Sequence, residues 1–169
     1  MLLELFKRWL HYALVSFSII SFIAIYKISL FAKDVPGITK DIIKIGIILD
    51  QTGPAANAVV PTTQGVKCYF QNISEKGGIN GRKIESLVED DRYSVPLAIT
   101  AFKKLVFRDK VFTLIAPTSS GALNALSRSV TRLKVPLLSP IMPEIAVKPF
   151  KRYVFTTADI YPNQNKVMV

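Results

Sequence analysis

The chain has few of the residues that disulfides, metal sites and many active sites require. Its 169 residues include one cysteine, Cys68, and one histidine, His11. A single cysteine excludes an intrachain disulfide framework and a metal site made of several cysteines. Because His11 lies in the apolar N-terminal stretch, serine–histidine and cysteine–histidine catalysis are excluded from the rest of the chain. We therefore predict a protein without metal, cofactor or enzymatic activity.

The chain also lacks a block of like charge, although it is basic. It carries 22 lysines and arginines against 12 aspartates and glutamates, a formal net charge of +10. The cations are scattered along the sequence, and on the predicted helices they fall mostly outside the apolar stripe. Solvated helix faces explain this pattern better than a nucleic-acid surface does. We predict no nucleic-acid partner.

One long apolar run stands at the N-terminus. Residues 10–26 contain no lysine, arginine, aspartate or glutamate, and after Lys27 the apolar sequence continues to residue 32. A membrane-spanning helix needs about 20 apolar residues, and Lys7 and Arg8 precede the run as in signal peptides and signal anchors. We predict a transmembrane helix within 1–33 that stays as a membrane anchor; the alternative is a signal that is cleaved. Either one places the remainder of the chain in the periplasm or extracellular space, with residues 34–41 as a linker.

After the linker, apolar segments alternate with turn signals. Ile42–Leu49 is a nearly continuous β-branched run, which predicts a strand buried on both faces. Glycines 77–78 end a helix and Asn80-Gly81 makes a turn into the next strand, at 83–89. Further strands are predicted at 111–116, 135–138 and 153–156, with intervening helices that begin at Thr62 or Thr63, at Ser94, and at Ser119 or Ser120. The last two helices are expected to bury one apolar face each, made of Ala98, Ile99, Phe102, Leu105 and Val106 in the first and of Leu123, Leu126, Val130 and Leu133 in the second. This order predicts an α/β fold, a doubly wound parallel sheet with helices on both faces.

The helix predicted after residues 62–63 carries the single cysteine. Apolar residues recur at helical spacing at Val66, Tyr69, Phe70 and Ile73, and we expect this stripe to be buried. Cys68 falls beside the stripe, and no cationic partner for its thiol is evident. We therefore predict a buried or half-buried structural thiol rather than a reactive one.

In parallel α/β sheets, ligands bind at the carboxyl ends of the strands. That rule selects four loops: 50–61, 90–94, 117–121 and 139–144. The strongest is Thr118-Ser119-Ser120-Gly121, at the start of a helix, where free N–H groups and two hydroxyls suit a carboxylate or a phosphate. Helix capping by one of the serines is the alternative. Asp90 and Asp91 are interpreted as loop and capping groups rather than metal ligands.

Six sequence segments in register resemble the type I periplasmic-binding proteins, in the branch that serves branched-chain amino-acid (Leu/Ile/Val) ABC transporters. The likeness covers about residues 42–164. The resembling segments are Ile45-Gly46-Ile47 with Thr52-Gly53-Pro54-Ala55-Ala56, Gly77-Gly78-Ile79-Asn80-Gly81-Arg82-Lys83-Ile84, Glu89-Asp90-Asp91, Ala116-Pro117-Thr118-Ser119-Ser120-Gly121, Val135-Pro136-Leu137-Leu138-Ser139-Pro140 and Tyr153-Val154-Phe155-Thr156-Thr157.

The resemblance implies a two-lobed clamshell that closes on a small ligand. Ser119 and Ser120 would hold the α-carboxylate and amino group of the ligand, and the loop after Ser139-Pro140 would add contacts. The predicted ligand-binding residues are Thr118, Ser119, Ser120, Gly121, Ser139, Met142 and Asn57. The family crosses to its second lobe just after the strand at 153–157. We therefore expect residues 42–169 to be an incomplete N-terminal lobe, one that binds weakly or not at all.

The predicted function is that of an extracytoplasmic solute-binding protein of an ABC transporter. Its ligand would be an amino acid or a similar small carboxylate, and its partners would be the membrane, through the N-terminal helix, and an ABC permease. The alternative is a ligand-sensing extracellular domain of a membrane receptor. A third interpretation, a remnant without function, predicts that the part after the anchor aggregates because apolar surface is left bare.

Overall fold

The computed structural model describes residues 34–141, 143–146, 148–157 and 159–167. From Val35 onward they belong to one compact unit. The predicted membrane segment, residues 1–33, lies outside the described residues, as does Met142. Within the described residues, no helix is both long enough and apolar enough to cross a membrane.

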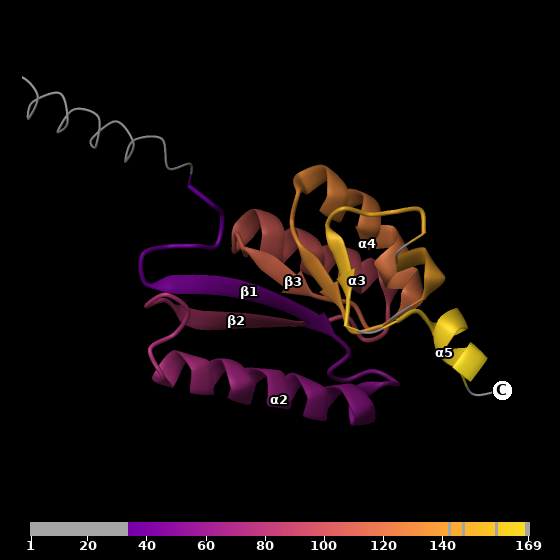
Figure 1. Cartoon of the computed structure of the whole chain (residues 1–169), viewed down its shortest axis with the longest axis horizontal. Coiled ribbons are helices and arrows are strands. Elements are labelled where there is room, and N and C mark those ends of the chain that lie inside the picture. Colours follow the sequence, from indigo (N-terminus) through magenta and orange to yellow (C-terminus); the bar gives the residue numbers. More distant parts are fainter. Residues whose placement is uncertain (1–33, 142, 147, 158, 168–169) are drawn as a thin grey trace, which may run out of the picture. The chain divides into compact units, whose positions relative to one another are not determined.

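The described strands form a five-stranded parallel sheet in the order β2-β1-β3-β4-β5 (Figure 1). The strand at Ile42–Leu49 has the predicted bounds. The strand at Thr113–Ile115 is shorter than predicted, because the N–H of Val111 donates to Leu105 C=O in the preceding helical turn. The strands are β1 (Ile42–Leu49), β2 (Lys83–Asp90), β3 (Thr113–Ile115), β4 (Leu137–Ser139) and β5 (Val154–Thr156).

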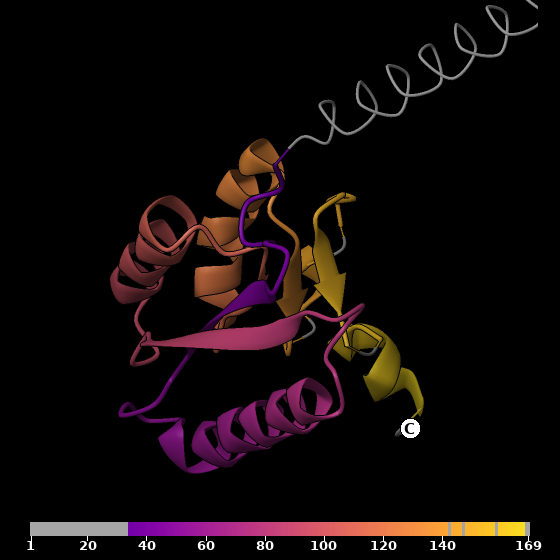
Figure 2. The same cartoon turned by 90° about the vertical axis from the view of Figure 1, so that its left-hand side faces the viewer.

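Helices cover both faces of this sheet, as Figure 2 shows: α2 lies on one side and α3 with α4 on the other. The predicted doubly wound α/β fold is therefore confirmed. The helices are α2 (Ala56–Glu75), α3 (Val95–Lys103) with a π-helical continuation η1 (Lys104–Arg108), α4 (Ser120–Leu133), the 3-10 turn η2 (Glu144–Ala146) and α5 (Tyr161–Val167).

The predicted start of α2 at Thr62 or Thr63 is wrong. The helix begins at Ala56 and contains Pro61. The chain turns into the helix immediately after β1, because the Asp50 carboxylate accepts hydrogen bonds from the N–H groups of Gly53 and Ala55. Pro61 removes one intrahelical donor near the helix start, a loss that the rest of this 20-residue helix tolerates. Residues 56–61 are therefore helix rather than loop.

The prediction of a buried Cys68 is also wrong, because the thiol is exposed. Tyr69, expected in the buried stripe, is 62% exposed. Val66, Phe70 and Ile73 are half-buried. Cys68 follows Val66 by two positions, roughly 200° around the helix, so its side chain projects to the other side. The buried stripe of α2 is thus narrower than the sequence suggests.

The main core lies between the sheet and the pair α3–α4. It combines inward strand residues with the predicted inward faces of both helices, which are confirmed. Its largest members are Ile48, Leu114 and Leu137 from the strands and Phe102, Leu105, Leu123, Leu126 and Val130 from the helical segments.

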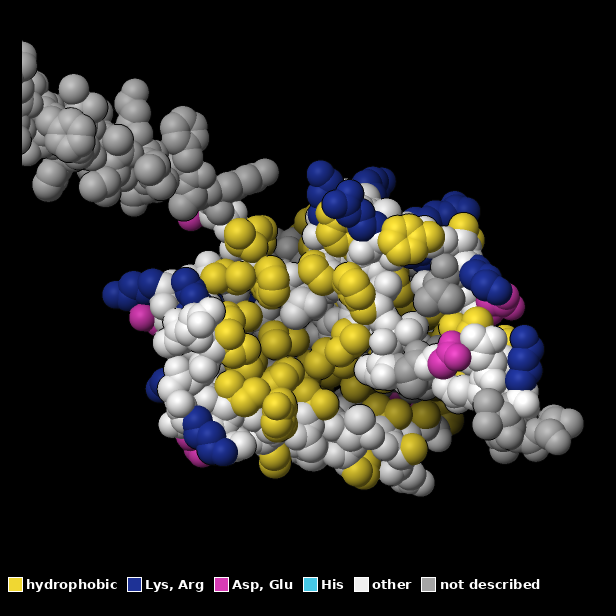
Figure 3. Space-filling view, in the orientation of Figure 1, with side chains coloured by type: hydrophobic (Ala, Val, Ile, Leu, Met, Phe, Trp, Pro, Cys, Tyr) yellow, Lys and Arg dark blue, Asp and Glu magenta, His cyan; other side chains and the backbone are white. Residues whose placement is uncertain are grey.

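The opposite face of the sheet is covered only in part. Strand register places Ile47, Ile115, Leu138 and Phe155 in one row across four strands. Ile47 is fully buried, whereas Leu138 is 38% and Phe155 52% exposed. Figure 3 shows hydrophobic side chains gathered on one face of the molecule, beside α2. The described residues thus leave apolar sheet surface bare over β4 and β5.

Candidate functional site

Three loops meet at the carboxyl edge of the sheet, where two buried carboxylates fasten them together. The Asp50 carboxylate accepts N–H hydrogen bonds from Gly53 and from Ala55, the latter at 2.8 Å. The Asp91 carboxylate accepts the N–H groups of Tyr93 at 2.9 Å and Thr118 at 3.3 Å. Asp50 N–H in turn donates to Thr118 Oγ1 at 2.7 Å. The loops after β1, β2 and β3 are therefore one hydrogen-bonded assembly.

Asp90 belongs to the same assembly but is less buried. Its carboxylate accepts hydrogen bonds from Gln51 N–H at 2.8 Å, Thr52 Oγ1–H at 2.6 Å and Arg92 N–H at 3.0 Å. Partial burial alone would raise the pKa of this carboxyl group, but the hydrogen bonds and the Arg92 charge together hold the pKa below its ordinary value of 3.8. The interpretation of Asp90 and Asp91 as loop and capping groups is confirmed by these contacts.

We expect this pKa to make part of the stability pH-dependent. Since the pKa of Asp90 is lower in the folded chain, its contribution to the free energy of unfolding is complete above the ordinary value and is lost as the pH falls below 3.8. Thermal unfolding midpoints measured across the acidic range should fall less steeply in Asp90→Asn than in the wild type. Asp41→Asn, at an exposed position, is the matched control. Equal slopes for Asp90→Asn and the wild type would contradict this assignment.

The start of α4 combines a capped helix end with free donors. Ser119 occupies the N-cap position and its Oγ accepts the N–H of Ala122 at 3.2 Å. The hydrogen bonds of the described residues give no partner to the N–H groups of Ser120 and Gly121, and both residues are exposed. These two N–H groups and the partial positive charge of the helix end suit an anionic ligand group.

The other predicted site residues divide into two groups. Thr118, Ser119 and Ser139 are buried and already hydrogen-bonded; Ser139 Oγ–H donates to Ile141 C=O at 2.7 Å. Asn57 is exposed in the first turn of α2, at the same edge. Met142 lies outside the described residues. The structure thus places Ser120, Gly121 and Asn57 where a solute can reach them, with Thr118, Ser119 and Ser139 holding the loops.

The supporting role of Asp50 was not predicted from the sequence. A signal was present, since an aspartate that directly follows a buried strand and precedes a glycine by three positions is typical of a side chain that accepts hydrogen bonds from its own loop. Its connection to Thr118 spans 68 residues and depends on β1 and β3 being neighbours. That connection could not be deduced from local sequence.

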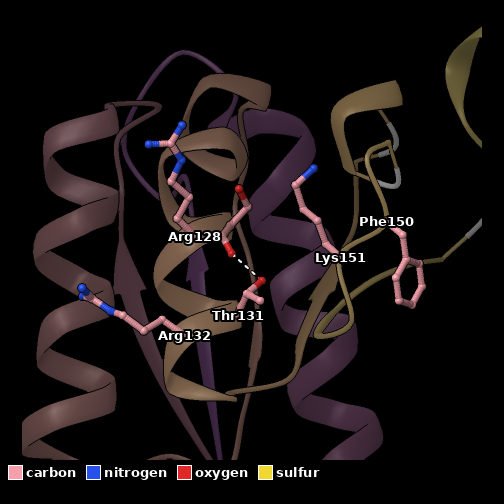
Figure 4. Close-up of a pocket in the computed structure, with 6 residues that line it drawn as sticks. Arg128, Thr131, Arg132, Phe150 and Lys151 are labelled. Carbon is pink, nitrogen blue, oxygen red and sulfur yellow. Dashed lines mark hydrogen bonds between the residues drawn. The ribbon is translucent and has the colours of Figure 1, made fainter.

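One hollow lined by described residues lies away from this edge. It has a volume of about 350 Å³ and lies toward the opposite end of α4, where Arg128, Arg132, Phe150 and Lys151 among others line it (Figure 4). At the carboxyl edge, Ser120, Gly121 and Asn57 are exposed on one wall. Such a wall requires a facing surface to enclose a ligand.

A parallel α/β lobe that presents a helix N-terminus and converging loops at one edge defines the class of ligand-binding α/β proteins. Residues 42–169 match the family model of the periplasmic binding proteins, and the chain belongs to this family. The predicted resemblance is confirmed. The family consists of solute-binding proteins, which are not enzymes and which act outside the cytoplasm.

Solved structures show the same fold. The fatty acid ABC transporter substrate-binding protein from Thermomonospora curvata matches with 25% identity and a TM-score of 0.73 over 80% of this chain and 34% of that one. The branched-chain amino acid transporter substrate-binding protein LivJ from Streptococcus pneumoniae, solved with isoleucine, matches with 28% identity and a TM-score of 0.66 over 71% of this chain and 34% of that one. The chain spans about a third of the length of these proteins. A comparison with curated protein sequences gave no match.

Proposed function

We propose that this chain forms the N-terminal lobe of an extracytoplasmic solute-binding protein of an ABC transporter, and that residues 1–33 anchor it in the membrane. Its ligand would be an amino acid or another small carboxylate. The observation that carries the proposal is the pair of free N–H groups, on Ser120 and Gly121, at the start of α4. The two relatives support it, since their names specify a fatty acid and isoleucine, and both ligands carry a carboxylate.

The hydroxyl of Ser120 and the side chain of Asn57 extend this wall. Ser120 is the first residue of α4, so its N–H points out of the helix end, and its side chain is exposed. Ser119 does not share this freedom, because its Oγ caps the helix. We assign ligand contact to Ser120 and Gly121, with Asn57 in the first turn of α2, and we assign positioning of the loop to Thr118 and Ser119.

The lobe by itself should bind weakly. A micromolar Kd corresponds to about 8 kcal/mol, whereas a hydrogen bond to a charged group contributes roughly 1.5–3 kcal/mol net. Two or three such bonds on an open wall, reduced by the entropy lost on association, give millimolar binding at best. Sequencing the gene through the codon for Val169 tests whether a second lobe follows in frame.

Ser120→Pro is a sharp test of the assigned donors. Proline is favoured at the first position of a helix, and Ser119 already has the extended backbone that a following proline requires, with φ −116° and ψ 148°. The substitution therefore removes one N–H from the site while keeping the helix. The full chain in micelles is titrated with L-isoleucine and followed by amide NMR shifts. In the wild type the Gly121 resonance should move, and in Ser120→Pro the same shift should require about tenfold more ligand.

Two controls isolate the carboxylate interaction. Ser120→Ala keeps the N–H and removes only the hydroxyl, so its titration should lie between those of the wild type and Ser120→Pro. Isoleucinamide lacks the carboxylate and should leave the Gly121 resonance in place. A response to isoleucinamide equal to that to isoleucine would contradict carboxylate recognition at this helix end.

A further inference from the structure

The edge of the sheet opposite the candidate solute site gathers cations that are far apart in the sequence. Because the described strands are parallel, the residues just before each strand share this edge, among them Lys134 before β4 and Arg152 before β5. Helix α4 runs back to the same edge, and Figure 3 shows lysine and arginine side chains gathered over this end of α4. We use the name basic edge for five residues: Arg128, Arg132, Lys134, Lys151 and Arg152.

Nearby acidic groups do not neutralise the basic edge. Asp109 lies close to the start of β3 but pairs with its neighbour Arg108, at 2.9 Å. Asp41 precedes β1 and lies 3.9 Å from Lys40 Nζ. In the part of the chain that the structure describes, none of the basic-edge side chains forms an ion pair with a carboxylate. Positive charge at this edge is therefore uncompensated.

Two exposed phenylalanines flank these cations. Phe150 is 85% exposed and lines, with Arg128 and Arg132, the hollow of about 350 Å³ shown in Figure 4. Phe107 is 59% exposed and lines a second hollow of about 160 Å³, which Arg132 also borders. Arg132 therefore borders both hollows. Water-exposed phenyl rings carry a free-energy cost that burial in an apolar or interfacial environment would remove.

Cations near the end of α4 also have an ordinary explanation, since they complement the helix dipole. That explanation covers Arg132 and Lys134, in the last turn and at the C-cap. It does not cover Lys151 and Arg152, which lie on a different segment, or the exposure of Phe150. Cations together with exposed aromatics are the combination found where proteins lie on anionic lipid.

The compact unit also begins at this edge. The Gly37 carbonyl accepts the N–H of Lys44 at 2.7 Å, and Phe112 N–H donates to Lys44 C=O at 2.9 Å. Residues 35–41 are thereby held against the start of β1 and β3.

We propose that the basic edge, with Phe107 and Phe150, is a docking surface for anionic lipid, on which the lobe lies with its carboxyl edge facing away from the bilayer. This inference does not depend on which solute the opposite edge binds.

The single cysteine allows a direct test on the full chain. A nitroxide label is placed at position 150 (Phe150→Cys with Cys68→Ser) and, as the matched control, on the native exposed Cys68. Both chains are reconstituted in phosphatidylcholine vesicles with or without phosphatidylglycerol. In the anionic vesicles we expect the label at 150 to become accessible to oxygen and shielded from a water-soluble nickel chelate. The label at Cys68 should remain accessible to the chelate.

Charge and salt supply independent readouts. Replacing Arg128 and Arg132 by glutamine should weaken the docked state about 30-fold, roughly fivefold for each cation. Salt near 1 M, where the Debye length is about 3 Å, should return the label to water without any mutation. A label at 150 that stays equally accessible to the chelate in both vesicle types would overturn the proposal. Release by a few millimolar inorganic phosphate at constant ionic strength would also overturn it, because a discrete anion site would then explain the charge.

Discussion

Replacing Asp50 with alanine is expected to lower the midpoint of thermal unfolding by roughly 10 °C. The carboxylate is fully buried and accepts hydrogen bonds from Gly53 and Ala55. Its loss leaves these donors unsatisfied at a buried corner, where each hydrogen bond to a charged group contributes about 1.5–3 kcal/mol. We expect a net loss of about 3 kcal/mol after allowing for the cost of burying the charge. Circular dichroism of the full chain in micelles measures the shift.

The location of the effect is as informative as its size. Hydrogen exchange of the Gly53 and Ala55 amides should become much faster in Asp50→Ala. The Thr118 loop should loosen as well, because the backbone N–H of residue 50 donates to Thr118 Oγ1 and thereby couples the two loops. Asp41→Ala, with its carboxylate largely exposed, should change the midpoint by no more than about 2 °C. Unchanged protection of residues 53 and 55 in Asp50→Ala would show that the carboxylate does not hold this loop.

Gly37→Ala is expected to destabilise the fold by a similar amount, about 3 kcal/mol. Gly37 has φ +76°, and an added Cβ would lie 2.1 Å from the backbone nitrogen of Phe112. A left-handed conformation costs a residue with a Cβ roughly 1–2 kcal/mol, and the clash with backbone forces a further displacement. The hydrogen bond from Lys44 N–H to Gly37 C=O should break as residues 35–41 move away. Thermal unfolding and exchange of the Lys44 amide check both effects.

Gly65→Ala is the matched control and should have the opposite sign. Gly65 lies inside α2 with nothing within 4 Å of an added Cβ. Alanine is favoured over glycine in a helix interior by roughly 0.5–1 kcal/mol, so this variant should be slightly stabilised. If both glycine variants were stabilised, the close contact between residue 37 and Phe112 would be wrong.

The strands and most helix faces could be predicted because burial leaves a local pattern. The β-branched run at Ile42–Leu49 became β1 with the same bounds, and the inward spacing of Phe102, Leu105 and Leu126 became the core. The start of α2 and the exposure of Cys68 could not be predicted in the same way. Both depend on tertiary contacts: the first on the Asp50 carboxylate and the second on how little of α2 the sheet covers.

The candidate site shows the same division. The Thr118-Ser119-Ser120-Gly121 segment was identified because hydroxyl residues at a strand-to-helix junction offer caps and donors. Only the hydrogen bonds show which of these residues hold the loop and which can contact a ligand. The Thr118 and Ser119 side chains hold the loop, whereas the N–H groups of Ser120 and Gly121 are left free. Local sequence cannot make that distinction, because the partner of Thr118 is Asp50, which directly follows β1 and lies 68 residues away in the sequence.

The sequence by itself determined the α/β class, the strand order along the chain and the resemblance to the periplasmic binding proteins, since each depends on short-range patterns of apolar, glycine and hydroxyl residues. It predicted the cations to be scattered on solvated faces. The tertiary structure gathered five of them at one edge, because parallel strands and a returning helix bring together the residues before β4, before β5 and at the end of α4. Three of the five, Arg128, Arg132 and Lys151, line a hollow with Phe150. Charge clustering depends on distances in space, and the fold alone fixes those distances.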